Sequence, residues 1–153
     1  MRWVILTVLV ALLLWPPRSS APNPSDAAIA AADALEAEFS EPYRILAAQM
    51  PARDDVARKR LAQLSGALFR VENAQLAALE KTAGQWHARL EADIVCALPT
   101  NSAELDLREA ATFAMAYRTM CTATDPHILQ HVVRDVIFAK SDGRWMAQLL
   151  PRD

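Results

Sequence analysis

Residues 54–98 read DDVARKRLAQLSGALFRVENAQLAALEKTAGQWHARLEADIVCAL, and this stretch decides the fold class because it is the longest run with one hydrophobic pattern. Within two consecutive sets, its apolar side chains recur at steps of three and four residues, as one face of a helix requires. The sets are Leu61, Leu64, Leu68 and Val71, then Leu76, Leu79, Ala83, Trp86 and Leu90. Gly66 and Gly84 weaken a helix interior. The stretch therefore predicts one long bent helix or two shorter ones.

The preceding segment is rich in alanine and also predicts helix. Residues 26–39 hold seven alanines, the residue type with the highest helix propensity, and Ser25 is suited to cap the first turn. Pro42 interrupts this pattern, but it fits the first turn of a second helix, where its missing N–H is not needed. That short second helix ends at Pro51.

A loop at residues 99–101 precedes the next predicted helix. Asn101 and Glu104 have the spacing of a capping box, in which each side chain bonds the backbone N–H of the other residue. The helix is expected to begin at about Ser102. Its apolar face comprises Leu105, Thr112, Phe113, Ala116 and Met120, with an interruption one turn after Leu105.

The last segment has two interpretations. Asp125 as N-cap and Pro126 as first helical residue start a helix through Lys140, with Ile128, Leu129, Val132, Val133, Val136 and Ile137 at helical spacing. The other interpretation is a β-hairpin, because Asp142-Gly143 is a typical turn pair between two β-favouring runs. We favour the helix. The predicted fold class is all-α, a small alanine-rich helical bundle with one disulfide; the alternative is α+β with a C-terminal β-hairpin around Asp142-Gly143.

Residues 1–21 have the pattern of a secretory signal peptide. A basic start is followed by an uncharged, mostly apolar run at residues 3–15, and then by Pro16-Pro17 and a small-x-small exit, so cleavage is expected after Ala21. The alternative is an uncleaved N-terminal anchor that touches the membrane through residues 3–15. A helix of that length rises only about 20 Å, short of the roughly 30 Å hydrocarbon core. Cleavage leaves residues 22–153 as a single helical domain, periplasmic or secreted.

The charge balance of the cleaved chain is acidic. Of 16 Lys and Arg, cleavage removes Arg2 and Arg18, which leaves 14 positive against 18 negative residues and a net charge of −4. Nucleic-acid binding draws on a concentrated excess of Lys and Arg. The composition therefore gives no reason to expect a nucleic-acid partner.

The two cysteines, Cys96 and Cys121, are expected to pair, because an exported protein matures in an oxidising compartment. Redox-active pairs are generally separated by two residues beside a helix start, and these are not. A structural disulfide is the favoured interpretation, and a free or redox-active pair is the alternative.

His127 and His131 form the sharpest local signal for chemistry. On a helix, residues four apart share one face, so the two imidazoles would lie close enough to hold a divalent metal ion, with Asp135 as a third ligand. The zinc-protease helix motif needs a Glu that is missing here. The plain alternative is a polar surface stripe with no cofactor.

No local motif indicates catalysis. Ser65, Ser102 and Ser141 lie in no nucleophile motif, and the chain has no glycine-rich phosphate loop. Asp54 and Asp55 adjoin basic residues, as a solvated helix start does. We expect an exported, non-enzymatic helical protein that binds another protein or envelope component. The first alternative is a small metal- or ligand-binding protein that uses His127 and His131, and an envelope hydrolase ranks below it.

Two segments, residues 32–43 and 61–71, have hydrophobic spacing similar to the paired helices of lysozyme-inhibitor-like domains, a family of small exported helical proteins. The distinctive Gln, Trp, Arg and Cys of that family are replaced here by Ser65, Leu68, Glu72 and Leu76. Trp86 and Cys96 do not have the separation needed to take their place. We therefore treat the similarity as a common helical pattern and not as membership.

Overall fold

Two helices begin the described part of the chain. The computed structural model describes residues 20–122 and 128–151. Helix α2 (Pro24–Gln49) is capped by Asn23, whose side chain accepts a hydrogen bond from the Ser25 backbone N–H at 3.0 Å. Helix α3 (Asp55–Ala67) is capped by Asp54, which accepts from the Ala57 N–H at 2.8 Å. The predicted start of a helix at Asp54-Asp55 is confirmed.

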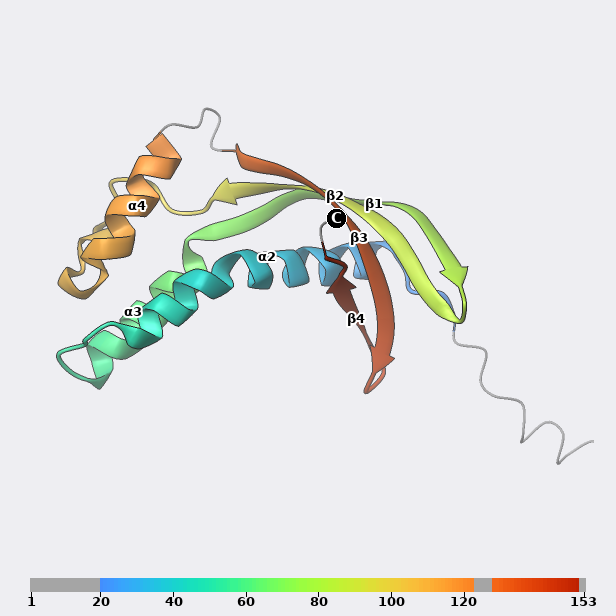
Figure 1. The fold of residues 1–153 in the computed structure, drawn as a ribbon, viewed down its shortest axis with the longest axis horizontal. Coiled ribbons are helices and arrows are strands. Elements are labelled where there is room, and N and C mark those ends of the chain that lie inside the picture. Colours follow the sequence, from blue (N-terminus) through green and yellow to red (C-terminus); the bar gives the residue numbers. More distant parts are fainter. Residues whose placement is uncertain (1–19, 123–127, 152–153) are drawn as a thin grey trace, which may run out of the picture.

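The four strands form one antiparallel sheet. They are β1 (Phe69–Thr82), β2 (Gln85–Cys96), β3 (Ile128–Ser141) and β4 (Arg144–Leu149), and their order in the sheet follows the sequence. Helix α2 runs along one face of the sheet and packs most closely against β1 and β4 (Figure 1). The opposite face carries exposed charged side chains such as Arg89, Glu91 and Asp135.

Between β2 and β3 the chain forms a separate helical unit. Two short 3-10 turns, η1 (Ala103–Asp106) and η2 (Arg108–Ala110), lead into helix α4 (Ala111–Thr122). A disulfide joins Cys96 at the end of β2 to Cys121 near the end of α4. The predicted disulfide is therefore confirmed, and it ties the helical unit to the sheet.

The core lies between α2 and the sheet, and it extends to α4 through a cluster of aromatic rings. Phe69 contacts Phe39 and Tyr43 at ring-centroid distances of 4.9 Å and Tyr117 at 5.6 Å. On α2 the residues facing the sheet include the fully buried Ala27 and Ala31. Their small side chains let the helix approach the strands closely, while the aromatic rings contribute most of the buried apolar area.

The prediction that residues 22–153 form an all-α helical bundle is wrong: the protein is α+β, the stated alternative. The largest error concerns residues 69–96, which form the β1–β2 hairpin and not a helix. Strand β1 is bulged between Glu72 and Gln75 and again between Ala77 and Glu80. Each bulge adds a residue to the strand, so the half-buried positions fall at Val71, Ala74, Leu76 and Leu79. These uneven steps conceal the alternation of a strand and imitate a helix.

The second error concerns residues 128–140, which form most of β3. Buried side chains alternate along it at Val132, Arg134, Val136 and Phe138, which is the period of a strand. The hairpin alternative at Asp142-Gly143 is confirmed, because both residues have positive φ, 49° and 78°, as a type I′ turn requires. The Asp125 and Pro126 signals for a helix start lie outside the described residues.

Two helix boundaries also differ from the prediction. Residues 24–49 form one helix with Pro42 inside it, and not two helices separated at Pro42. The expected capping box at Asn101 and Glu104 is not formed; instead the Ser102 hydroxyl accepts from the Glu104 N–H at 3.3 Å. That cap starts the 3-10 turn η1, and the α-helix begins only at Ala111.

The expected signal peptide falls on residues 1–21, of which residues 1–19 lie outside the described residues. Within the described ranges, no helix combines the length and apolar character needed to cross a membrane.

Candidate functional site: a groove between α3 and the η2–α4 segment

A large cavity lies between the start of α3 and the segment that contains η2 and the first turn of α4. It has a volume of about 900 Å³, and an adjoining cavity of about 510 Å³ shares Arg60 and Leu107 with it. We call the two cavities together the basic groove. Its principal lining residues are Met50, Arg53, Val56, Arg60, Leu107 and Arg108.

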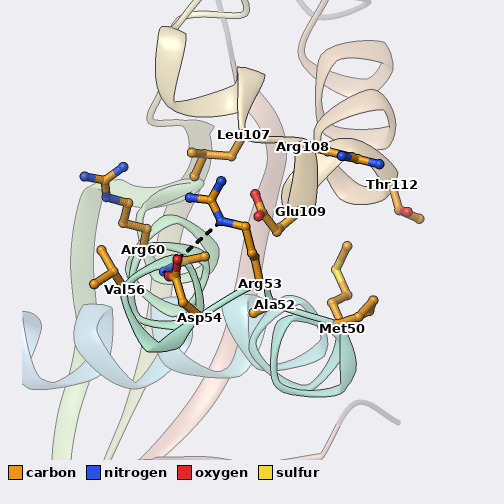
Figure 2. A pocket seen from close by; sticks show the side chains of 12 residues that line it. Met50, Ala52, Arg53, Asp54, Val56, Arg60, Leu107, Arg108, Glu109 and Thr112 are labelled. Atoms are coloured by element: carbon orange, nitrogen blue, oxygen red, sulfur yellow. Dashed lines mark hydrogen bonds and ion pairs between the residues drawn. The ribbon is translucent and has the colours of Figure 1, made fainter.

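Three arginines line the groove from different elements. Arg53 comes from the loop before α3, Arg60 from α3 itself and Arg108 from η2. Figure 2 shows Arg53 in the middle, turned toward Asp54, with Arg60 and Arg108 on opposite sides. In the part of the chain that the structure describes, Arg53 pairs with Asp54 at 3.3 Å, whereas Arg60 and Arg108 form no ion pair. Two exposed guanidinium groups are thus available to an external anion.

Apolar side chains share the groove with these charges. Leu107 belongs to both cavities, Val56 is 61% exposed, and the buried Leu64 also lines the smaller cavity. Exposed apolar area beside uncommitted charge is typical of binding surfaces. The groove therefore combines an apolar lining with arginines in its wall.

Asp54 and Glu109 are the acidic side chains of the larger cavity and Glu104 is that of the smaller one, so the groove is lined by three carboxylates as well as three guanidinium groups. The hydrogen bond from the Ala57 N–H lowers the pKa of Asp54, and the contact with Arg53 lowers it further. Asp54 therefore stays ionised at neutral pH and is committed to the helix cap and to Arg53. The sequence predicted that Asp54 lies beside basic residues at a solvated helix start, and its contact with Arg53 agrees with this. The sequence did not indicate that Arg108 lines the same groove, because the fold brings it there.

The proposed metal ligands are not arranged as the sequence suggested. His131 and Asp135 lie on strand β3, where residues four apart are separated by about 13 Å, and His127 lies outside the described residues. The helical arrangement that would have brought these side chains together is therefore wrong. Among the described residues, no group of three or more His, Cys, Asp and Glu side chains is placed to hold a metal ion.

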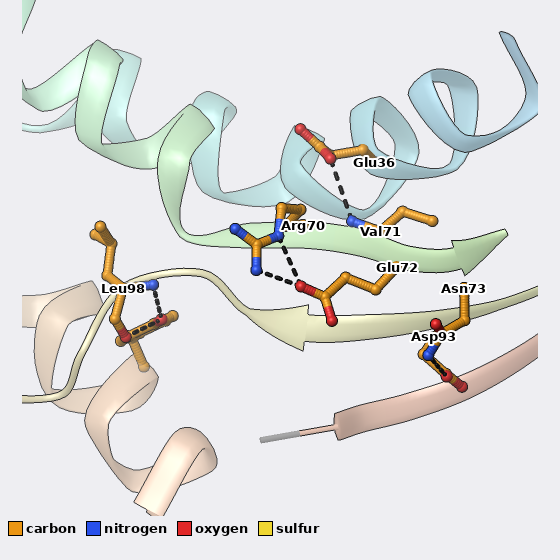
Figure 3. Close-up of polar contacts among 8 residues, drawn as sticks. Glu36, Arg70, Val71, Glu72, Asn73, Asp93 and Leu98 are labelled. Atoms are coloured by element: carbon orange, nitrogen blue, oxygen red, sulfur yellow. Dashed lines mark hydrogen bonds and ion pairs between the residues drawn. The ribbon is translucent and has the colours of Figure 1, made fainter. Parts of the chain in front are cut away.

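His131 instead joins a small polar cluster on the outer face of the sheet. Its Nδ1 lies 2.8 Å from Asp93 Oδ1. The Asn73 side-chain amide donates to Asp93 Oδ2 at 2.8 Å, a contact drawn in Figure 3. Asn73 sits in the first bulge of β1 with a φ of 53°, which places its side chain opposite Asp93. The two hydrogen bonds, Asn73 first and His131 second, lower the pKa of Asp93. The cluster links the three strands β1, β2 and β3.

Two of the serines noted in the sequence have structural contacts. Ser65 is buried and its hydroxyl donates to the Ala62 carbonyl at 2.8 Å, while Ser102 caps η1. The third, Ser141, is exposed at the end of β3. These placements give the serines local roles in the helices and the turn.

No protein-family model, curated protein or solved structure matches this chain. The chemistry of its own surface is thus the basis for a functional proposal.

Proposed function

We propose that this chain is an exported, non-enzymatic protein that binds another polypeptide through the basic groove. The uncommitted Arg60 and Arg108 on an apolar lining carry this proposal. The disulfide between Cys96 and Cys121 supports maturation in an oxidising compartment, since such bonds are rare in the cytosol.

The chemistry of the groove selects the kind of segment that it binds. Guanidinium groups pair with carboxylates through two parallel hydrogen bonds, and Arg60 and Arg108 are held on different elements across the groove. Leu107 and Val56 offer apolar contact beside them. The partner segment therefore carries acidic side chains and apolar side chains together, as one face of an amphipathic helix does.

The charge of the whole chain makes the groove a distinct feature. Residues 22–153 carry a net charge of −4 by the count above, so a general attraction to acidic partners is not expected. Binding of an acidic segment would then depend on the local arginines and weaken as salt screens them.

The test uses synthetic amphipathic peptides of about 15 residues that share one apolar pattern and carry Glu, Gln or Lys at the polar positions. Fluorescence anisotropy measures their affinity for the purified, oxidised chain. We expect the Glu peptide to bind more tightly than the Gln peptide, and the Lys peptide most weakly. The double variant Arg60→Glu, Arg108→Glu is expected to weaken the Glu peptide about tenfold or more.

The matched control is Arg89→Glu, Arg144→Glu, which makes the same change in net charge at two exposed arginines of the sheet. It should leave the affinity for the Glu peptide within about twofold. Equal binding of the three peptides, or equal losses in the two double variants, would refute the proposal.

A further inference from the structure

Strand β3 is longer than the strand that pairs with it on one side. It extends from Ile128 to Ser141, but β4 pairs only with the part from Val136 to Ser141 (Figure 1). On the other side, β2 pairs along β3 from Ile128 to Phe138. The half of β3 before Val136 therefore has a neighbour on one edge and none of the described strands on the other.

The direction of the backbone groups on this open edge follows from one hydrogen bond. The Leu150 N–H donates to the Asp135 carbonyl at 2.9 Å, so the Asp135 backbone faces the β4 side. Backbone direction alternates along a strand, so His131 and Val133 face the same side. Their two N–H groups and two carbonyls, together with the Asp135 N–H, have no partner among the described strands.

The chain itself is prevented from filling this edge. In an antiparallel pair of this kind, the Leu150 carbonyl would accept from the Asp135 N–H. Instead it accepts from the Arg134 guanidinium, whose Nε lies 3.0 Å away and whose Nη1 also donates to Glu38 at 3.0 Å. The next residue is Pro151, which has no N–H to donate. The buried Arg134 thus turns the chain away from the sheet after Leu149.

The two outer edges of the sheet differ from this one. The outer edge of β1 is broken by two bulges, and β4 is a short edge strand of six residues. Natural proteins use bulges, short edge strands and charged side chains to prevent pairing between sheets. On the open half of β3, by contrast, Val133 and Ile128 are each 38% exposed. These are β-branched apolar side chains, which favour strand pairing.

We propose that this edge pairs with the same edge of a second copy of the chain, so that two sheets join into one across a two-fold axis. Only an extended polypeptide offers N–H and carbonyl groups at the spacing of a strand, and the edge is complementary to itself when two copies run antiparallel. The open stretch of each copy, residues 128–134, pairs with the same stretch of the other, so that His131 of each copy faces His131 of the other and exchanges two hydrogen bonds with it. Leu150 limits the register, because it occupies the position opposite Asp135 in each copy.

This inference does not depend on the basic groove, which lies at α3 and η2. Sedimentation equilibrium of the purified, oxidised chain, from about 10 µM to about 1 mM, tests it. We expect a reversible monomer–dimer equilibrium. Amide hydrogen exchange by NMR at the two ends of this range should show the N–H groups of His131 and Val133 becoming slower as the dimer forms, whereas those of Val132 and Arg134, which face β2, change little.

The variant Val133→Pro removes one of the unpaired N–H groups without removing a hydrogen bond of the monomer. It should raise the dissociation constant of the dimer at least tenfold. Ala147→Pro is the matched control, since the Ala147 N–H also faces away from β3, and it should leave the dissociation constant unchanged. If the proline variant does not fold, Val133→Lys replaces it in this test, because a charge at the edge also opposes strand pairing.

A molar mass that stays equal to that of the monomer over the whole concentration range would overturn the proposal. So would a dimer in which the amide exchange of His131 and Val133 does not respond to concentration, or one that forms equally well in the Val133 variants.

Discussion

Asp54 is the residue whose local role is clearest in both sequence and structure. Its carboxylate caps α3 and contacts Arg53, and both interactions lower its pKa. A carboxyl group with a lowered folded-state pKa stabilises the fold above its unfolded-state pKa, and this contribution is lost as the pH falls through the folded-state pKa. We therefore expect Asp54→Ala to lower the urea midpoint at pH 7, and the difference from wild type to shrink below about pH 4.

Asp54→Asn is the control for this prediction, because Asn is also a good N-cap but cannot ionise. It should retain more stability than Asp54→Ala at pH 7. A difference between wild type and Asp54→Ala that stays constant from pH 7 to acid pH would contradict a role for the ionised carboxylate.

Tyr117 joins α4 to the end of β2 through its hydroxyl. The Tyr117 side chain is fully buried, and its hydroxyl accepts from the Leu98 N–H at 2.9 Å and donates to the Leu98 carbonyl at 2.8 Å. Tyr117→Phe leaves both backbone groups unpaired and should cost about 1–3 kcal/mol in the free energy of unfolding. Tyr43→Phe is the control, since its hydroxyl has only a 3.8 Å contact with Met120 Sδ. Equal losses measured by urea denaturation would contradict this account.

At the scale of elements, the start of α3 could be predicted and the strands could not. Asp54 caps α3 by a side chain that touches only its own first turn, so the signal is local. Strand β1 depends on partners across the hairpin, and its two bulges remove the alternation by which strands are recognised. Along β2 the alternation is regular, with Ala88, Leu90, Ala92 and Ile94 buried. The helical spacing of the apolar side chains from Leu76 to Leu90 competes with this alternation and predicts a helix instead.

The turn between β1 and β2 explains a second part of the same error. Ala83 and Gly84 both have positive φ, 50° and 86°, as a type I′ turn requires. Asn-Gly and Asp-Gly are the strong sequence signals for such a turn, and Ala-Gly is not. In the sequence Gly84 therefore resembles a weak point of a helix. In the structure it is the residue whose positive φ lets the chain reverse direction between β1 and β2.

The disulfide connects two elements that belong to different parts of the fold. It joins residues 25 positions apart, and loop-closure entropy assigns such a link about 3 kcal/mol of stability. The variant Cys96→Ala, Cys121→Ala should lose about this amount in the free energy of unfolding while keeping its far-UV circular dichroism, because Phe113 and Tyr117 still bury α4. A loss below about 1 kcal/mol would indicate that α4 is held by packing alone.

At the scale of the whole molecule, Phe69 is the residue on which α2, β1 and α4 meet. It is 2% exposed and contacts Phe39, Tyr43 and Tyr117. Phe69→Ala should lower the free energy of unfolding by about 3–5 kcal/mol, because it removes an aromatic side chain and leaves a cavity. Met115→Ala on the exposed face of α4 is the control and should cost less than about 0.5 kcal/mol. A loss at Phe69 as small as that at Met115 would show that this cluster does not hold the helices on the sheet.

The candidate site also depends on the whole molecule. Arg53 and Arg60 were visible as charged neighbours of one helix start, but Arg108 follows them by more than forty positions and arrives from η2. The sequence indicated His127 and His131 as metal ligands because residues four apart share one face of a helix. Since residues 128–141 form a strand, the same spacing places His131 beside Asp93 of the neighbouring strand.

The sequence by itself determined the features that need only neighbouring residues or simple counting: the cap at Asp54, the end of α2 before Pro51, the turn at Asp142-Gly143 as an alternative, and the pairing of the chain's two cysteines. Only the tertiary structure decided that residues 69–96 and 128–149 form a sheet and that three arginines share one groove. The physical reason is that a helix satisfies its backbone hydrogen bonds within a few residues, whereas a strand satisfies them with a partner that lies elsewhere in the chain.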